Sequence, residues 1–523
     1  MTTKAFIELT KEKDLGKTFD FTAKVEMIKQ TSGPTLMVLS DGTANFTFKA
    51  FLKPGARAYP EVEIGDIVHV TAQINERNSD IEGEVIGLKK ASITDAETFL
   101  TAIQEIKNKR YAPTNTTFSI KSKVLESLKT RFIDVATVIR KAVIDGKPIL
   151  LRHNADCDGY SSAVTIERAI IGLMNDISGG DVMLQYQNYR RAPSKAPFYE
   201  YEDAVKDLAT WMRDKVKNGA QAPLIIITDN GSTDEDIIAI KQMKIYDCPI
   251  VVVDHHFPGK ITNGKVEVDK YLEAHINPYL EGFDSNVSAG MLGYELARFI
   301  YENNNSVLIP ATAAILDHTE GEEREQYVAQ AKALGFTEDY MQNLGEIIDM
   351  QSHYLRFSEA REFVNDLFGA NMEAQKRIVE MLSPELKRRY DTVWNIAKHY
   401  AKVEDLGPFF VVEFDGEKGT QRGEYPAIGK STNHVHKMFE STLSKPVVTM
   451  TTGPTFITVR VSDAVKGFSV NDFVNEVYDT KNFTAVDGGG HEHAGSIKFV
   501  EYGKEEMIGA FKDYLKRVSQ KNH

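Results

Sequence analysis

Three short apolar runs, each ending in acidic or histidine residues, constrain the fold of this chain most strongly. They read "PILLRHNADCDG", "APLIIITDNGS" and "CPIVVVDHH". Each run has the length of a strand and no polar alternation, and segments with helical spacing such as "YEDAVKDLATWMRDKV" separate them. Strands that are apolar on both faces are typical of a parallel sheet covered by helices on each side. The pattern predicts a doubly wound α/β domain over residues 123–320, with "DVMLQYQN" as a further strand.

The segments on either side of this domain follow other periodicities. Residues 1–95 alternate apolar and polar positions between turn residues, which predicts five strands in an OB-fold-like barrel that binds nucleic acid. Its "NFTFKAFLKPGARAYP" supplies rings and cations for such a surface, although the rings fit a barrel core equally well. Residues 96–122 are predicted as a linker, 321–406 as a helical region and 407–523 as an α+β domain.

The charge and the two cysteines limit the class of protein. A formal net charge of −13 gives no global attraction to a polyanion, so local patches or metal ions have to hold one. Cys157 and Cys248 form no CxxC pair, which fits a reducing compartment. The sequence has no signal-peptide pattern and no apolar run of about 18 residues. We therefore expect a cytoplasmic protein without a membrane partner.

The polar residues after the apolar runs are candidates for a metal site, because ligands of doubly wound sheets bind beyond the carboxyl ends of the strands. We expect four clusters on one edge of the sheet. An Asp after a strand is by itself often a helix N-cap, as Asp158 or Asp229 could be, and a His pair is often a surface feature. Together, carboxylates and imidazoles suit Mn²⁺ or Mg²⁺, and their mutual repulsion calls for cations. The candidates are His153, Asp156, Asp158, Asp229, Asp254, His255, His256, Asp317 and His318.

Five motifs carry a family resemblance. In this order, "HNADCDGYSS", "TDNGS", "VVVDHH" and "AAILD" resemble the four motifs of the DHH phosphoesterase superfamily. "GGGHEHAGS" is similar to the glycine-rich motif of the associated DHHA1 domain. With an OB-like domain in front, the chain resembles RecJ-like single-strand exonucleases of the archaeal type. The resemblance implies that residues 123–320 form the DHH catalytic domain and residues 407–523 the DHHA1 substrate-binding domain.

The resemblance also implies roles for the candidates. Two Mn²⁺ ions, with Mg²⁺ as the alternative, would be bound, one of them by His153, Asp156 and Asp229. The second ion would be held by Asp158, Asp229, His255 and Asp317. Asp254 would orient a histidine without touching an ion, and His256 would lie beside the scissile phosphate. The spacing of His153 differs by one residue from that of relatives.

Phosphate contacts are expected in two further segments. Three glycines, Gly488, Gly489 and Gly490, would let backbone N–H groups approach a phosphate, and either His491 or His493 would donate to it. The alternative is a flexible turn between strands. In "YRRAPSKAPF", Arg190, Arg191 and Lys195 either contact phosphate or lie in a solvated loop. Asn277 is expected to cap or to contact substrate, and Ser288, Ala289 and Gly290 to allow tight helix packing.

The function that follows is hydrolysis of single-stranded DNA or RNA to mononucleotides by two-metal catalysis, in which the cations activate a water molecule. Partners implied by the resemblance are the nucleic acid strand and replication-helicase or repair proteins. One alternative is a phosphodiesterase for short oligoribonucleotides or cyclic dinucleotides. A non-catalytic replication scaffold is another, but a scaffold has no reason to keep mutually repelling carboxylates. A pyrophosphatase fits less well, because those relatives have a different C-terminal domain.

Overall fold

In the computed structural model, the chain forms two compact units. The N-terminal unit contains Met1–Met341 and Phe357–Arg361, and the C-terminal unit contains Gln342–Arg356 and Glu362–His523. The residues described are 4–77, 80–178, 188–194, 196–218, 221–302, 305–355, 358, 360–419, 423–480, 486–491 and 493–521.

The chain begins with a closed five-stranded barrel, as the alternating pattern predicts. Its strand order is β1-β2-β3-β5-β4, with β3 and β5 parallel and the other neighbours antiparallel. Every second side chain of the first strand, from Phe19 to Val25, is buried in the barrel core. The elements are η1 (Phe6–Glu8), α1 (Lys11–Asp14), β1 (Thr18–Gln30), β2 (Thr35–Ser40), β3 (Asn45–Ala50), β4 (Ile67–Arg77), β5 (Asp80–Lys90) and α2 (Ile93–Tyr111).

A five-stranded, entirely parallel sheet forms the centre of the N-terminal unit. Its order is β10-β9-β8-β6-β7, so the first of these strands along the chain lies inside the sheet. The winding direction therefore reverses between β6 and β8, and such a reversal is where open α/β sheets form their ligand crevice. The strands are β6 (Ile149–His153), β7 (Tyr189–Pro193), β8 (Leu224–Thr228), β9 (Ile250–Val253) and β10 (Ala274–Ile276).

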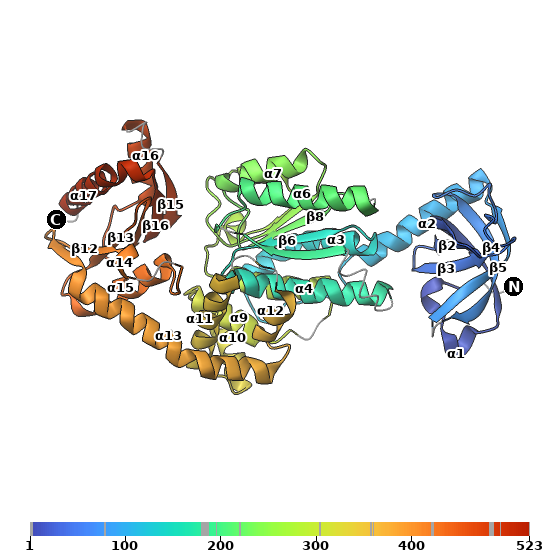
Figure 1. The fold of residues 1–523 in the computed structure, drawn as a ribbon, viewed down its shortest axis with the longest axis horizontal. Coiled ribbons are helices and arrows are strands. Elements are labelled where there is room, and N and C mark those ends of the chain that lie inside the picture. Colours follow the sequence, from blue (N-terminus) through green and yellow to red (C-terminus); the bar gives the residue numbers. More distant parts are fainter. Residues whose placement is uncertain are drawn as a thin grey trace. The chain divides into compact units, whose positions relative to one another are not determined.

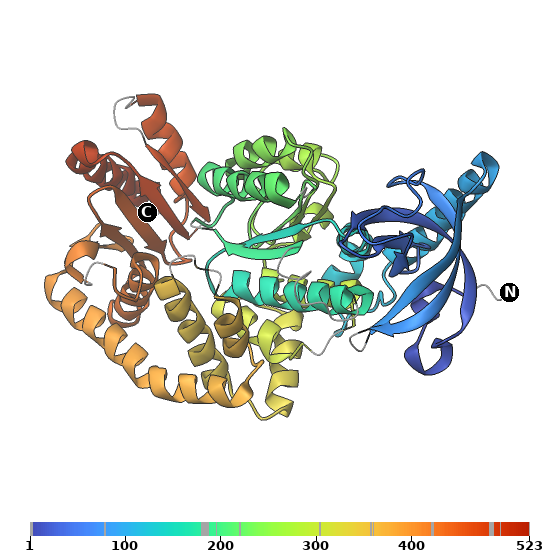
Figure 2. The same cartoon turned by 45° about the vertical axis from the view of Figure 1, so that its right-hand side comes forward.

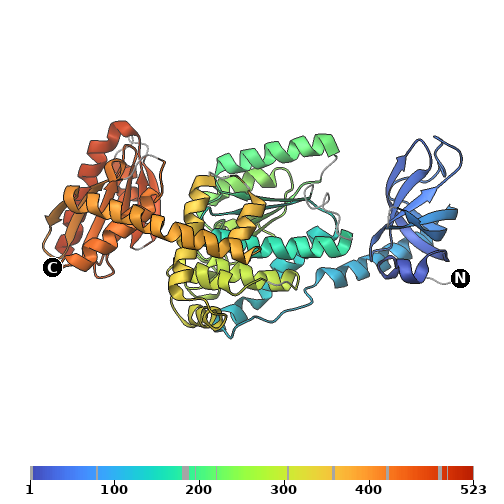
Figure 3. The ribbon, with the colours of Figure 1, turned by 60° about the horizontal axis from the view of Figure 1, so that its bottom comes forward.

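Helices cover both faces of this sheet, which explains its continuous apolar strands (Figure 1, Figure 3). On one face, Ile225, Ile227 and Val252 pack with Leu208 of α6 and Ile240 of α7. On the other, α4 packs with α8 and α9. The elements are α3 (Lys123–Ile144), α4 (Cys157–Ser178), α6 (Tyr201–Asn218), η2 (Asp234–Asp236), α7 (Ile237–Lys244), η3 (Glu267–Tyr271), η4 (Pro278–Glu281), α8 (Ala289–Ile300), α9 (Leu308–Leu316) and α10 (Glu322–Ala333).

The C-terminal unit combines helices with a six-stranded mixed sheet of order β11-β12-β13-β14-β16-β15. One face packs on α16 and α17, and the other on α13 and α15 (Figure 2). The elements are α11 (Glu338–Leu355, which spans both units), α12 (Arg361–Leu367), α13 (Met372–Tyr400), β11 (Lys402–Asp405), β12 (Phe410–Asp415), α14 (Gly416–Gly419), α15 (Ile428–Thr442), β13 (Val447–Thr452), β14 (Phe456–Val461), α16 (Val470–Thr480), β15 (Asp487–His491), β16 (Ala494–Lys498), η5 (Glu501–Gly503) and α17 (Lys504–Lys521).

The predicted fold class is confirmed, and some local predictions are wrong. The apolar segment of "ATAAILD", whose element type the sequence left open, is the helix α9, and it is buried on all sides. "YRRAP" is not a surface loop but β7 at the edge of the parallel sheet. "DVMLQYQN" lies outside the described residues except for its last residue. In the described part of the chain, we find no helix with the length and apolar character needed to cross a membrane.

Candidate metal centre

Three of the four predicted clusters lie at the carboxyl edge of the parallel sheet. His153 ends β6, Asp229 follows β8, and the triplet Asp254–His256 follows β9. The fourth cluster comes from elsewhere, since Asp317 caps the C-terminus of α9. Its carboxylate nevertheless lies 3.7 Å from His255 Nδ1, so Asp317 joins the other clusters although it comes from a helix and not from a strand.

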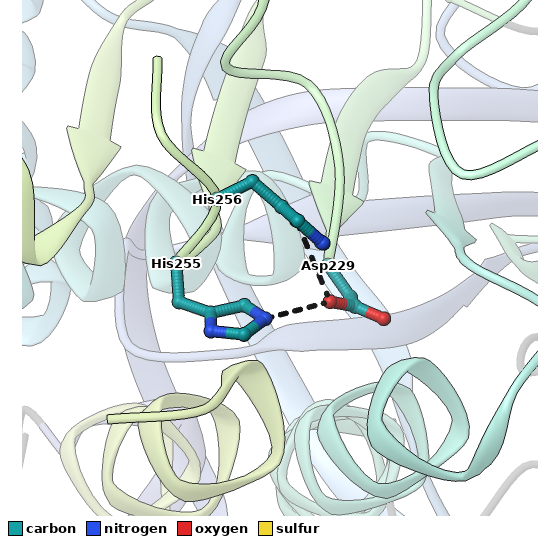
Figure 4. A group of neighbouring side chains, drawn as sticks. All are labelled: Asp229, His255 and His256. Atoms are coloured by element: carbon teal, nitrogen blue, oxygen red, sulfur yellow. Dashed lines mark ion pairs between the residues drawn. The ribbon is translucent and has the colours of Figure 1, made fainter. Parts of the chain in front are cut away.

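Asp229 is buried and both histidines approach it. The Oδ1 atom of Asp229 lies 3.5 Å from His255 Nε2 and 3.8 Å from His256 Nδ1 (Figure 4). Its Oδ2 atom has no hydrogen-bond partner among the described residues. Burial, followed by the charges of Asp156 and Asp158, raises the pKa of Asp229 well above its ordinary value. The backbone at Asp229 has φ of 58°, so this residue is not the N-cap that the alternative reading suggested.

His255 presents its Nε2 atom to two of the acids. Its Nδ1 atom lies 3.0 Å from the carbonyl oxygen of Ser285, so this nitrogen carries the proton in the neutral ring. Nε2 then faces Asp158 Oδ2 at 3.7 Å as well as Asp229. Burial acts to lower the pKa of His255, but the carboxylates of Asp317, Asp229 and Asp158 outweigh it and raise the pKa well above the ordinary value.

The N-terminus of α8 holds Asp158. Ala289 N donates to Asp158 Oδ2 at 2.8 Å, and Gly290 N donates to Oδ1 at 2.9 Å. Asp158 itself lies in the first turn of α4, so it is not an N-cap either. From the sequence, Ala289 and Gly290 are expected only to pack. Their backbone role was missed because a donated N–H leaves no residue-type signal, although "SAG" at a helix start is compatible with it.

His153 and Asp156 complete the edge at β6. His153 is fully buried, and its Nδ1 lies 2.6 Å from the carbonyl oxygen of Asn154. Its Nε2 has no hydrogen-bond partner in the part of the chain that the structure describes. Burial, then the charge of Arg191, lowers the pKa of His153 well below its ordinary value, so the ring is neutral. Asp156 Oδ1 accepts a hydrogen bond from Gly159 N at 3.0 Å, which is the capping contact expected of an Asp before a helix.

Asp254 positions His256. Its Oδ1 atom lies 2.7 Å from His256 Nδ1 and accepts the backbone N–H groups of His255 and His256 at 2.8 and 3.3 Å. Burial would raise the pKa of Asp254, but His256 lowers it below its ordinary range. Burial acts to lower the pKa of His256, but Asp254 raises it to about 9. Asn277 Nδ2 donates to the carbonyl oxygen of His256 at 2.9 Å, while its Oδ1 caps Tyr279 N as expected of a cap.

The donor set fits divalent cations. Two groups have ligand atoms within 4.8 Å of one another, and they share His255. Several buried polar atoms nearby lack hydrogen-bond partners within the described ranges, namely His153 Nε2, Asp229 Oδ2 and His255 Nε2. Unpaired buried lone pairs and clustered carboxylates cost free energy unless a cation offsets them. The two groups are Asp229, His255 and His256, and Asp158, His255 and Asp317.

The two arginines of β7, which were predicted to contact phosphate, differ in burial. Arg191 is fully buried, with its guanidinium 5.6 Å from the ring of Tyr160, which in turn packs on His153 at 4.4 Å. Arg190 on the same strand is exposed, and Lys195 lies outside the described residues.

The three glycines of the glycine-rich motif lie in a strand, so the alternative prediction of a flexible turn is wrong. Gly488, Gly489 and Gly490 lie in β15 at the edge of the C-terminal sheet. A Cβ at Gly488 would lie 2.5 Å from the carbonyl oxygen of Ser496, so this close strand pairing requires glycine. His491 ends β15, but its side chain is outside what the structure describes. His493 Nε2 lies 3.8 Å from Asp463 Oδ1.

Fold and site together define an α/β protein with a cluster of acids and histidines at the switch point of a parallel sheet. No family model matches the chain. It is 38% identical over 523 residues to the uncharacterized protein MJ1198 of Methanocaldococcus jannaschii, covering 95% of this chain and 68% of that protein. A solved structure described as the DHH domain of PF0399, a member of a family of ribosomal proteins, is 34% identical. That match covers 81% of this chain and 99% of the other, with a TM-score of 0.77.

The chain belongs to the DHH-domain family. Its fold is also that of an exonuclease RecJ whose structure was solved bound to manganese. This match has 15% identity and a TM-score of 0.51, and it covers 77% of this chain and 96% of that one.

Proposed function

We propose that this protein is a divalent-metal-dependent phosphodiesterase, an exonuclease that hydrolyses single-stranded DNA or RNA to mononucleotides. The observation that carries the proposal is the buried cluster around Asp229, in which carboxylates and imidazoles meet without enough protein hydrogen bonds to satisfy them. Such a cluster is stable and useful only with cations, and cation clusters at a sheet's carboxyl edge are suited to phosphoryl chemistry.

We assign the ligands as the family resemblance implies. His153, Asp156 and Asp229 would hold one ion, and Asp158, Asp229, His255 and Asp317 the other. Mn²⁺ is the first choice because the RecJ structure of the same fold is described as bound to manganese, with Mg²⁺ as the alternative. When bound, the ions would supply positive charge that favours ionisation of the attacking water and stabilises the phosphoryl oxygens.

The protein's own side chains would orient the substrate. His256 is about a quarter exposed, with 24% of its side chain accessible, while Asp254 holds its Nδ1 at 2.7 Å. This contact fixes the ring, so Nε2 can donate to an oxygen of the scissile phosphate. The α8 N-terminus keeps both oxygens of Asp158 in place, and Ser285 keeps His255 in one tautomer. Backbone N–H groups of Gly488–Gly490, with His491 or His493, would bind a substrate phosphate, and Arg190 is a further candidate for a phosphate contact.

The surface of the barrel favours a nucleic acid strand, rather than a small molecule, as the substrate. In the loop after β3, Phe51 has 63% of its surface exposed, and Lys53 and Arg57 follow it. Exposed rings beside cations are the features with which such barrels stack and hold single-stranded nucleic acid. A phosphodiesterase for dinucleotides would have no use for this surface.

The test is cleavage of DNA and RNA strands labelled separately at the 5′ and 3′ ends, in Mn²⁺. We expect labelled mononucleotides from one end and loss of activity by more than about a hundredfold in Asp229→Asn, because loss of an outer-shell partner alone costs about 10–100-fold. Asp339→Asn, on the exposed first turn of α11, is the matched control and should act as the wild type. Absence of cleavage with Mn²⁺ bound, or full activity of Asp229→Asn, would contradict the proposal.

A further inference from the structure

A concave site lies beside the segments that follow β8 and β9. It is a cavity of about 520 Å³, a size within the range of small-ligand sites. Asp234 lines it from the segment after β8, five residues beyond Asp229, and Pro258 lines it two residues beyond His256. The remaining wall is the loop and 3₁₀ helix that lead to β10. We call this site the lysine pocket, because Lys260, Lys265 and Lys270 contribute to its lining.

The charges of the lysine pocket favour an anion. Its acid Glu267 is paired with Lys270 at 2.6 Å. Asp269 has both oxygens engaged, by His275 Nδ1 and by Val266 N, each at 2.8 Å. Among the described residues, Lys260 and Lys265 have no ion-pair partner, and Asp234 is the third acid of the lining. Two exposed ammonium groups at one concave surface are typical of phosphate binding.

Hydrogen bonds connect the pocket wall to the catalytic triplet. From Asp269, the chain of contacts runs through His275 Nε2 to Ser232 Oγ at 2.9 Å, and from Ser232 to Asn277 Nδ2 at 3.1 Å. Asn277 in turn donates to the carbonyl oxygen of His256 at 2.9 Å. These linking side chains are buried. The pocket and His256 are therefore parts of one rigid scaffold, as a binding subsite requires.

An exposed ring follows His256 directly. Phe257 has 55% of its surface exposed, and the edge of Tyr279 supports it at a centroid distance of 5.3 Å. A supported, exposed ring offers a face on which any nucleobase can stack. Phe257 lies in sequence between His256 and Pro258 of the pocket lining.

We propose that the lysine pocket binds the phosphate of a nucleotide neighbouring the one that is cleaved, and that Phe257 stacks on its base. The proposal rests on the proposed function, because it takes the substrate to be a nucleic acid strand. The segment after the DHH triplet would then select substrates by length, because a substrate with one phosphate cannot occupy both the metal centre and the lysine pocket.

The first test is equilibrium binding of a fluorescent hexathymidylate to the full chain in EDTA, over a series of salt concentrations. The variant is Lys260→Gln/Lys265→Gln, and the matched control is Lys121→Gln/Lys123→Gln, two exposed lysines of the same unit outside the pocket. We expect the slope of log affinity against log salt to become less negative by about 0.7 in the pocket variant, which is the value for the one phosphate that the two lysines would neutralise. An unchanged slope in the pocket variant, or an equal change in the control, would overturn the proposal.

The second test is cleavage in Mn²⁺, with hexathymidylate and bis(4-nitrophenyl) phosphate as substrates. For the lysine variant and for Phe257→Ala, we expect the ratio of kcat/KM on the strand to kcat/KM on the small diester to fall about tenfold. A ratio equal to that of the wild type would overturn the proposal. If the wild type cleaves neither substrate while the salt slope changes as expected, the pocket stands and the proposed function fails.

Discussion

At the contact between α8 and α4, the helix packing and the proposed metal site share atoms, and Gly290 tests this. A Cβ at Gly290 would lie 2.5 Å from Ala313 Cβ and 2.9 Å from Ser161 Cβ. It would also lie 2.9 Å from Asp158 Oδ1, the atom that Gly290 N holds. Since Ala313 and Ser161 belong to α9 and α4, Gly290→Ala forces α8 away from both helices.

The expected cost has two parts. Overpacking a well-packed core destabilises by about 1–3 kcal/mol, and we expect Gly290→Ala to fall in this range. Displacement of α8 also lengthens the two backbone hydrogen bonds to Asp158, and bonds to a charged group contribute about 1.5–3 kcal/mol each. Loss of one such bond would lower Mn²⁺ affinity by about tenfold or more, because about 1.4 kcal/mol is a factor of ten.

The assay combines urea denaturation in EDTA with calorimetric titration of Mn²⁺. Trp211 in α6 and Trp394 in α13 allow each unit to be followed separately in single-tryptophan backgrounds. Gly509→Ala is the matched control: this glycine lies in the middle of α17, where an added Cβ meets nothing within 4 Å. There the same substitution should stabilise the C-terminal unit by about 0.5–1 kcal/mol, through helix propensity.

Two outcomes would refute the reasoning. If Gly290→Ala changed the free energy of unfolding by less than about 0.5 kcal/mol, the glycine would not be required for the helix contact. If it destabilised the N-terminal unit but left Mn²⁺ affinity unchanged, the α8 N–H groups would not be what positions Asp158.

Three further results are expected. Asp254→Asn should lower kcat about 10–100-fold while changing the Mn²⁺ dissociation constant less than about threefold, because the Asp254 carboxylate holds the His256 ring, which we assign to the phosphate and not to an ion; equal changes in both would show that Asp254 also supports ion binding. Because burial raises the pKa of Asp229 well above its ordinary value, a cation would have to displace a proton there, so Mn²⁺ affinity should rise as the pH rises above the ordinary carboxyl range; calorimetry that found no pH dependence would contradict this. Burial also raises the pKa of Asp236 to about 7, so between about pH 4 and pH 7 the folded state holds a proton that the unfolded state has lost. The free energy of unfolding of the wild type should therefore fall as the pH rises through this interval, by up to about 4 kcal/mol relative to that of Asp236→Asn. Urea denaturation at several pH values measures this difference, and a difference that stayed constant would contradict the prediction.

The order of elements could be predicted where the local pattern has one explanation. Apolar runs such as Leu224–Thr228 are buried at every position, and only a sheet covered on both sides accommodates that. The same pattern was ambiguous for Leu308–Leu316, because a short apolar run fits a buried helix as well as a strand. The segment "YRRAP" was not recognised as a strand for a different reason: two arginines in five residues hide its burial. Arg191 can be buried because it pairs with Glu167 and stacks on the ring of Tyr160.

The sequence by itself determined which residues could bind cations and that several of them follow strands, because residue type and periodicity are local properties. The tertiary structure alone decided how they meet. Asp158 is held by backbone groups 131 and 132 residues away, and Asp317 reaches His255 from the end of a helix. The raised pKa of Asp229 likewise depends on burial and on neighbours from other strands and helices. Desolvation and charge pairing are sums over the packed surroundings of a group, and no local pattern along the chain contains them.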